Sequence, residues 1–160
     1  MSETPTTITT IPTIPTAPKT PRRWGDVPPP DDALEVQNLL QVYGFLTDQG
    51  RGQELGTLFV DDAEWDGTEL GFGSARGRDD IVALVTRHVD PARPMIHLPG
   101  PPVLTGGEDE IHGVCWCMAT FWTGSGTAPL LYFHYEDVFQ RQSGDWRFAR
   151  RVLRRRFPDA

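Results

Sequence analysis

The sequence is poor in cysteine and has no apolar run long enough to cross a membrane. Its only cysteines are Cys115 and Cys117, whose spacing points both side chains to one face of a strand. A disulfide between such close neighbours would strain the backbone, and a zinc site would need more ligands than this pair offers. We therefore expect two free, buried cysteines, no metal or cofactor, and the reducing environment of the cytoplasm.

Basic residues are also few: the chain has 15 basic residues and 22 acidic residues, and its net charge is −7. Such a chain is poorly suited to hold nucleic-acid phosphates, which require patches of Lys and Arg. The basic cluster over residues 147–156 is interpreted mainly as one solvated strand face. The N-terminus lacks the basic and apolar regions of a secretory signal. We expect a protein that binds neither nucleic acid nor membrane.

The first 30 residues differ in composition from the rest of the chain. The stretch "TPTTITTIPTIPTAPKTP" is rich in Thr and Pro and has no helical period. Proline fixes φ and removes a backbone donor, so residues 1–30 are expected to form an extended, mobile tail. Residues 31–157 are long enough to form one folded domain with a core of ordinary size.

Three helices are predicted in the first half of this domain. The first begins at Asp32, where Glu35 completes a capping-box pattern, and it ends near Asp48, before Gly50. A short second helix is expected over residues 52–59, and the segment "GRDDIVALVTRHV" predicts a third. The residues expected to face the core are Val36, Leu40 and Tyr43 in the first helix, and Ile81, Leu84, Val85 and His88 in the third.

Strands are predicted for the second half of the domain, from Pro94 onward. The candidates are residues 95–104, 110–123, 129–140 and 146–157, separated by the turn-rich stretches "TGGED", "TGSGT" and "QSGD". The earlier segment "DDAEWDG" is interpreted as a turn that leads into a short strand. Helices followed by long antiparallel strands indicate an α+β domain in which the helices cover one face of the sheet.

A few polar residues stand where they could carry chemistry. Tyr43 and Asp48 lie five residues apart at the end of the first helix, so both can border one cavity, although a core tyrosine and a solvated acid fit the spacing equally. His97, in "PMIHLPGPPV", is either a structural strand histidine or a catalytic base. The remaining histidines, His88, His112 and His134, show no metal-cage spacing.

Several segments together resemble the SnoaL-like branch of the nuclear transport factor 2-like superfamily. They are "DDALEVQNLLQVYGFLTDQGRGQELGTLFVDDAEWDG", "ARGRDDIVALV", "IHLPG" and "YFHYEDVFQRQSGDWRFARRV", in this order over roughly residues 31–153. The resemblance implies a cone-shaped, curved mixed β-sheet covered by three helices and enclosing a pocket. The superfamily includes polyketide cyclases, scytalone dehydratase, bile acid dehydratase, hexachlorocyclohexane dehydrochlorinase and ketosteroid isomerase, together with non-catalytic relatives.

The resemblance also implies a site and a function. Asp48 and His97 fall at the positions of the Asp–His pair in the dehydratase and dehydrochlorinase branch, and Tyr43 matches a tyrosine of the bile acid dehydratases. We expect a cofactor-free dehydratase or other lyase that acts on a hydrophobic cyclic or polyketide-like small molecule. The alternatives are a polyketide cyclase or double-bond isomerase with the same base, or a non-catalytic binding subunit. Relatives generally pair through the sheet, so a homodimer or homotrimer is expected.

The pocket is expected to take its walls from the strands. Alternation along each strand means that about half of the candidates must face away. Prolines in "HLPGPPV" predict a bulge or edge after His97, and Asp137 is interpreted as structural. The substrate-pocket candidates are Trp116, Met118, Trp122, Tyr132, His134 and Arg150, with Phe121 and Phe133 as further aromatic surface and Arg151 as the alternative to Arg150.

Overall fold

The computed structural model describes residues 26–90, 92–124 and 129–156, so most of the predicted tail, residues 1–25, lies outside the described residues. The first half contains α1 (Pro30–Asp48), α2 (Gly52–Gly56), β1 (Phe59–Asp66), a 3₁₀ turn (Thr68–Leu70), β2 (Ser74–Arg76) and α3 (Arg78–Arg87). The second half contains β3 (Met95–Pro99), β4 (Val103–Gly106), β5 (Glu110–Phe121), β6 (Leu130–Gln142) and β7 (Asp145–Arg155).

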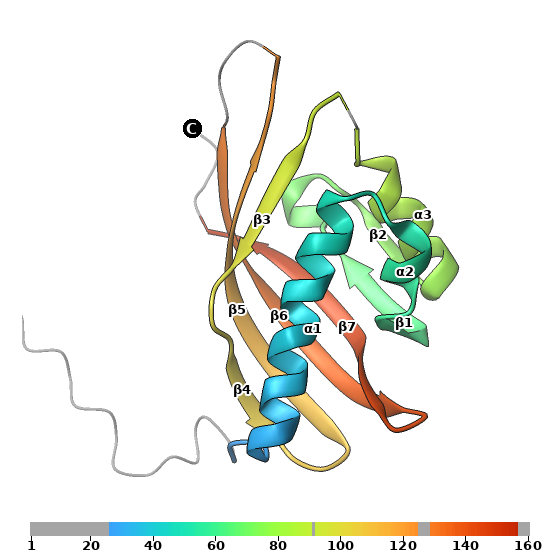
Figure 1. The fold of residues 1–160 in the computed structure, drawn as a ribbon, viewed down its shortest axis with the longest axis vertical. Coiled ribbons are helices and arrows are strands. Elements are labelled where there is room, and N and C mark those ends of the chain that lie inside the picture. The colour runs from blue at the N-terminus through green and yellow to red at the C-terminus, as the bar shows by residue number, and fades with distance from the viewer. Residues whose placement is uncertain (1–25, 91, 125–128, 157–160) are drawn as a thin grey trace, which may run out of the picture.

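The strands form one curved, mixed sheet in the order β2-β1-β7-β6-β5-β3, with β4 also paired to β5. Only the β1–β7 pair is parallel among the described pairings. Figure 1 shows α1 lying along the sheet, while α2 and α3 pack beside β1 and β2. The predicted α+β class, with helices on one face of a curved sheet, is therefore confirmed.

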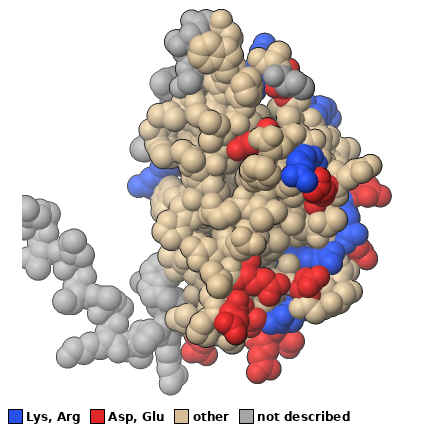
Figure 2. All heavy atoms as spheres, in the orientation of Figure 1, with Lys and Arg blue, Asp and Glu red and all other residues tan. Residues whose placement is uncertain are grey.

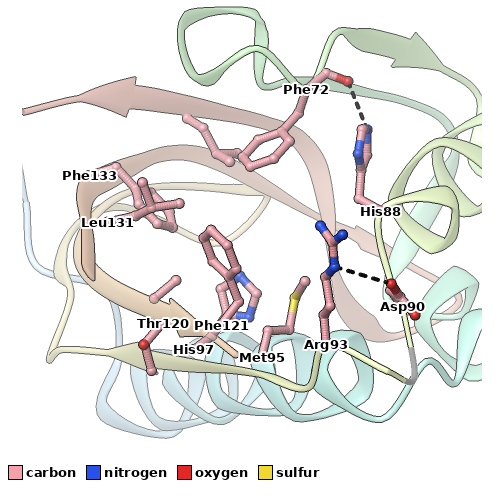
Figure 3. Close-up of a pocket in the computed structure, with 12 residues that line it drawn as sticks. Phe72, His88, Asp90, Arg93, Met95, His97, Thr120, Phe121, Leu131 and Phe133 are labelled. Carbon is pink, nitrogen blue, oxygen red and sulfur yellow. Dashed lines mark hydrogen bonds and ion pairs between the residues drawn. The ribbon is translucent and has the colours of Figure 1, made fainter. Parts of the chain in front are cut away.

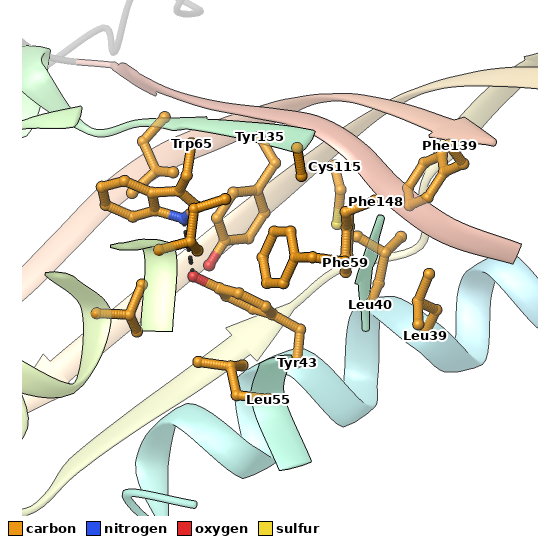
Figure 4. Close-up of a cluster of buried hydrophobic side chains, with 14 of the residues drawn as sticks. Leu39, Leu40, Tyr43, Leu55, Phe59, Trp65, Cys115, Tyr135, Phe139 and Phe148 are labelled. Carbon is orange, nitrogen blue, oxygen red and sulfur yellow. Dashed lines mark hydrogen bonds between the residues drawn. The ribbon is translucent and has the colours of Figure 1, made fainter. Parts of the chain in front are cut away.

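The apolar stripe of α1 forms the centre of the core (Figure 4). Val36, Leu40 and Tyr43 are all buried, as predicted. The Tyr43 ring makes edge contacts with Phe59 and Phe148, whose ring centroids lie 6.1 and 5.7 Å away. Burying an apolar side chain contributes about 1.5–3 kcal/mol, so this stripe is what holds α1 on the sheet.

The predicted capping box at the start of α1 is wrong. The helix begins at Pro30, and no side chain caps its N-terminus. Asp32 instead accepts a hydrogen bond from Trp146 Nε1 at 3.1 Å, and Glu35 accepts one from the Trp146 backbone N–H at 3.0 Å. The Trp146 hydrogen bond holds the pKa of Asp32 below its usual value. These two acids attach the helix start to the β6–β7 hairpin, a long-range contact that local spacing does not reveal.

Two other predicted boundaries differ from the structure. The second helix ends at Gly56, and the segment interpreted as a turn belongs to β1, because residues 59–66 gain backbone partners from distant β7. The predicted strand over residues 95–104 is interrupted as its prolines suggested: β3 ends at Pro99 and β4 begins at Val103, and both pair with β5.

The surface of the described residues carries both acidic and basic side chains. On the face seen in Figure 2, acidic and basic side chains lie mainly along the lower and right margins, and much of the middle is uncharged. Within the described part of the chain, no helix is long and apolar enough to span a membrane.

Candidate functional site

Asp48 and His97 meet where the end of α1 lies beside β3. Asp48 Oδ1 is 2.6 Å from His97 Nδ1, and Asp48 Oδ2 accepts a hydrogen bond from the His97 backbone N–H at 2.9 Å. A carboxylate can only accept, so Nδ1 carries a proton, and in the neutral ring Nε2 keeps the lone pair. The two side chains are only 12% and 14% exposed. The predicted contact between these residues is therefore present.

Gly44 lies where α1 packs against β3. A Cβ atom at position 44 would lie 3.4 Å from His97 Cβ and 3.5 Å from Pro99 Cγ, which is ordinary van der Waals contact. Asp48 follows Gly44 by one helical turn and so lies on the same side of α1. The packing of this side of α1 against β3 thus brings the Asp48 carboxylate to both the backbone and the ring of His97.

His97 lies on the walls of two adjoining pockets. The outer pocket has a volume of about 240 Å³, and the inner pocket has a volume of about 60 Å³. Tyr43, Trp65 and Tyr135 line the inner pocket only. Together the pockets lie near the lower end of the volumes typical of ligand sites, roughly 300–1,000 Å³, so only a small molecule would fit them. The apolar lining of the outer pocket consists of Phe72, Met95, Ala119, Phe121, Leu131, Phe133 and Leu153 (Figure 3).

Tyr43 presents its hydroxyl group at the inner pocket. Its Oη atom accepts a hydrogen bond from Trp65 Nε1 at 3.0 Å, so its own O–H is still able to donate (Figure 4). Burial raises the pKa of Tyr43, and the Arg151 charge opposes part of that rise. The phenol consequently stays protonated at neutral pH and can act as a hydrogen-bond donor to an oxygen in the inner pocket.

Arg151 and Asp137 form a buried ion pair beneath Tyr43. Arg151 Nε and Nη2 donate to the two Asp137 oxygens at 2.8 Å each, and the side chains are 0% and 1% exposed. The guanidinium carbon lies 4.1 Å from the Tyr43 ring centroid and 3.8 Å from that of Tyr135. Burial lowers the pKa of Arg151, but the charge and hydrogen bonds of Asp137, together with Tyr135 and Tyr43, outweigh this effect and the pKa is raised. Arg151, and not Arg150, is therefore the inward-pointing arginine.

Most of the predicted substrate-pocket residues lie outside the two pockets. Trp116, Met118 and Tyr132 are 51%, 41% and 42% exposed on the outer face of the sheet, because the alternation of β5 and β6 turns their neighbours inward. His134 contacts Trp116 on that same face, with ring centroids 5.0 Å apart. These four assignments to the pocket are wrong.

Two further assignments fail for a related reason. Trp122 lies just beyond the end of β5 and is 45% exposed, and Arg150 points outward toward Glu64 at 3.8 Å. Neither side chain lines the outer or the inner pocket. Of the aromatic candidates, Phe121 and Phe133 do line the outer pocket.

Sequence reasoning missed several pocket residues from outside the long strands. Phe72, His88 and Met95 line both pockets, although they come from a loop, the end of α3 and the start of β3. His88 was expected on the buried side of the third helix, and this expectation is wrong, because the helix ends at Arg87 and His88, one residue beyond it, is exposed. In the described ranges, no group of three or more His, Cys, Asp or Glu side chains could hold a metal ion.

Comparisons with solved structures identify the same fold. A nuclear transport factor 2-like protein with a cystatin-like fold from Novosphingobium aromaticivorans is 28% identical, with a TM-score of 0.70, over 81% of this chain and 85% of that one. A proposed scytalone dehydratase from the same organism is 24% identical, with a TM-score of 0.67, over 78% and 83%. A hexachlorocyclohexane dehydrochlorinase (LinA, type 2) is 19% identical, with a TM-score of 0.67, over 78% and 84%.

Sequence comparison places the chain in a family. No curated protein matches it. The model of the SnoaL-like domain, however, matches residues 30–152, which include α1, the His97 strand and most of the sheet. This chain therefore belongs to the SnoaL-like domain family.

Proposed function

We propose that this protein is a cofactor-free acid–base enzyme that eliminates water, or a similar leaving group, from a small, apolar, cyclic molecule. The observation that carries the proposal is the contact between Asp48 and His97 on the wall of an apolar cavity. A pure scaffold has no need of a histidine whose ring and backbone are both held by one carboxylate. Two proteins of similar fold bear the names of elimination enzymes, a dehydratase and a dehydrochlorinase, which favours this reaction class.

The chemistry follows from the roles that these atoms can take. His97 Nε2 removes a proton from a carbon next to a carbonyl group, and Asp48 holds the required tautomer and stabilises the imidazolium. The O–H group of Tyr43 donates to the carbonyl oxygen as negative charge develops on it. The apolar lining limits the access of water to the enolate.

The same base would also serve other reactions. A double-bond isomerase returns the proton to a different carbon, and a polyketide cyclase lets the enolate attack a second carbonyl group. Both begin with removal of a proton by His97. A non-catalytic binding subunit would bind the same ligands and transfer no proton.

Turnover of β-hydroxycyclohexanone to cyclohexenone tests the proposal, because the conjugated product absorbs in the near ultraviolet. We expect His97→Gln and Asp48→Asn to lower the rate by about 10²–10⁴. Tyr43→Phe should lower the rate by a smaller factor, since it removes only the hydroxyl group and keeps the ring. His112→Gln is the matched control, because His112 is exposed and lines neither pocket. Wild-type protein that binds this ketone and its alkyl derivatives without turnover would support the non-catalytic alternative.

A further inference from the structure

A second histidine, His88, stands on the walls of both pockets. It is the C-cap residue of α3. Its ring packs edge-on against the Phe72 ring, and the two ring centroids lie 5.2 Å apart. His88 Nε2 lies 3.3 Å from the Phe72 carbonyl oxygen, which can only accept. Nε2 therefore carries a hydrogen, and Nδ1 is the ring nitrogen that this contact leaves for other partners.

His88 and His97 border the cavity from different elements. Figure 3 shows the His88 ring near the end of α3 and the His97 ring on β3, with the space of the pocket between them. Both residues line the outer and the inner pocket. His88 is exposed, whereas the side chain of His97 is 14% exposed. The cavity is thus bordered by one sheltered histidine and one that solvent reaches.

We infer that His88 is a second catalytic residue, the acid that protonates the leaving group, and that the substrates are β-hydroxy carbonyl compounds. This inference rests on the proposed function. His97 Nε2 takes the proton as the C–H bond breaks, and the electron pair of that bond forms the enolate. When the enolate collapses, the new C=C bond forms as the C–O bond breaks, and the leaving oxygen takes the proton from Nδ1 of the His88 imidazolium. One substrate gives one enone and one water, and solvent returns the proton from His97 to His88.

The two pockets separate this role from that of Tyr43. Tyr43 lines only the inner pocket, whose 60 Å³ suits a carbonyl oxygen better than a ring. The bulk of the substrate then lies in the outer pocket, which His88 reaches and Tyr43 does not. The C-terminal end of α3 presents helix carbonyl groups beside His88, and these groups favour a positive charge there.

Two reactions of matched ketones test the inference. Exchange of the α-protons of cyclohexanone in D₂O needs a base and a donor to the carbonyl oxygen but no leaving-group acid. Elimination of water from β-hydroxycyclohexanone needs the base, the donor to the carbonyl oxygen and the acid that protonates the leaving group. His88→Gln keeps an N–H donor for the Phe72 carbonyl and removes the titrating ring, with His112→Gln as the matched control. We expect His88→Gln to slow elimination by about 10²-fold or more and to leave exchange near the wild-type rate.

A third ketone separates proton donation from positioning. β-Acetoxycyclohexanone releases acetate, which needs no proton, so His88→Gln should act on it as the wild type does. Normal elimination of water by His88→Gln would overturn the inference and leave the proposed function standing. If His88→Gln lost both exchange and elimination while its circular dichroism spectrum stayed unchanged, the inference would also be overturned. His88 would then act only by shaping the cavity. Absence of exchange in the wild-type protein would instead refute the proposed function.

Discussion

Removing the guanidinium of Arg151 should unfold this domain at a much lower temperature. Arg151 is fully buried, and it donates two hydrogen bonds of 2.8 Å to Asp137. Arg151→Met would leave the Asp137 carboxylate buried and uncompensated, which costs about 3–5 kcal/mol. For a chain of this size each kcal/mol shifts Tm by about 2–4 °C, so the expected loss is roughly 6–20 °C.

Thermal melts followed by circular dichroism measure this loss. Arg150→Gln is the matched control, because the neighbouring residue points outward, is 45% exposed and lies 3.8 Å from Glu64. A surface change of this kind alters stability by less than about 0.5 kcal/mol. The double variant Arg151→Met/Asp137→Leu should regain part of the loss, since both buried charges are gone. A single variant Arg151→Met that melts within about 2 °C of the wild type would refute the argument from burial.

Two further predictions concern the cysteines and the outer sheet face. Burial raises the pKa of Cys115 and Cys117 from 9.0 to about 11, so both thiols should resist iodoacetamide in the native protein and react after denaturation. Because the folded state holds these protons more tightly, stability should fall as the pH rises from 9.0 toward 11, and rapid native labelling would contradict the assignment. We also predict self-association through the exposed apolar face of β3, β5 and β6, where Leu98, Trp116 and Tyr132 are 42–54% exposed. Sedimentation should show an oligomer that Trp116→Glu disrupts, and a wild-type monomer at micromolar concentration would contradict this.

The buried stripe of α1 and the Asp48–His97 contact could be predicted, for two different reasons. A helix has a fixed period, so Val36, Leu40 and Tyr43 must share a face wherever the helix packs. The contact to His97 crosses 49 residues of sequence, and only the resemblance to a family connected the two positions.

The inward face of β5 could not be chosen from the sequence, because both faces of the strand carry apolar side chains. Size favoured Trp116 and Met118 as cavity walls, yet the inward positions hold Gly113, Cys115 and Cys117. The reason is space: a Cβ atom at position 113 would lie 2.9 Å from the Phe139 ring. Small residues are needed on β5 where large aromatic residues of other elements already fill the core, and that requirement appears only in three dimensions.

Exchange of the α-protons of cyclohexanone in D₂O, followed by proton NMR, tests the central claim most directly, because it isolates the action of the His97 base. The account predicts measurable exchange by the wild-type protein, a decrease of about 10²–10⁴ in His97→Gln, and no decrease in His112→Gln. Exchange by folded His97→Gln at the wild-type rate would contradict the assignment of His97 as the catalytic base.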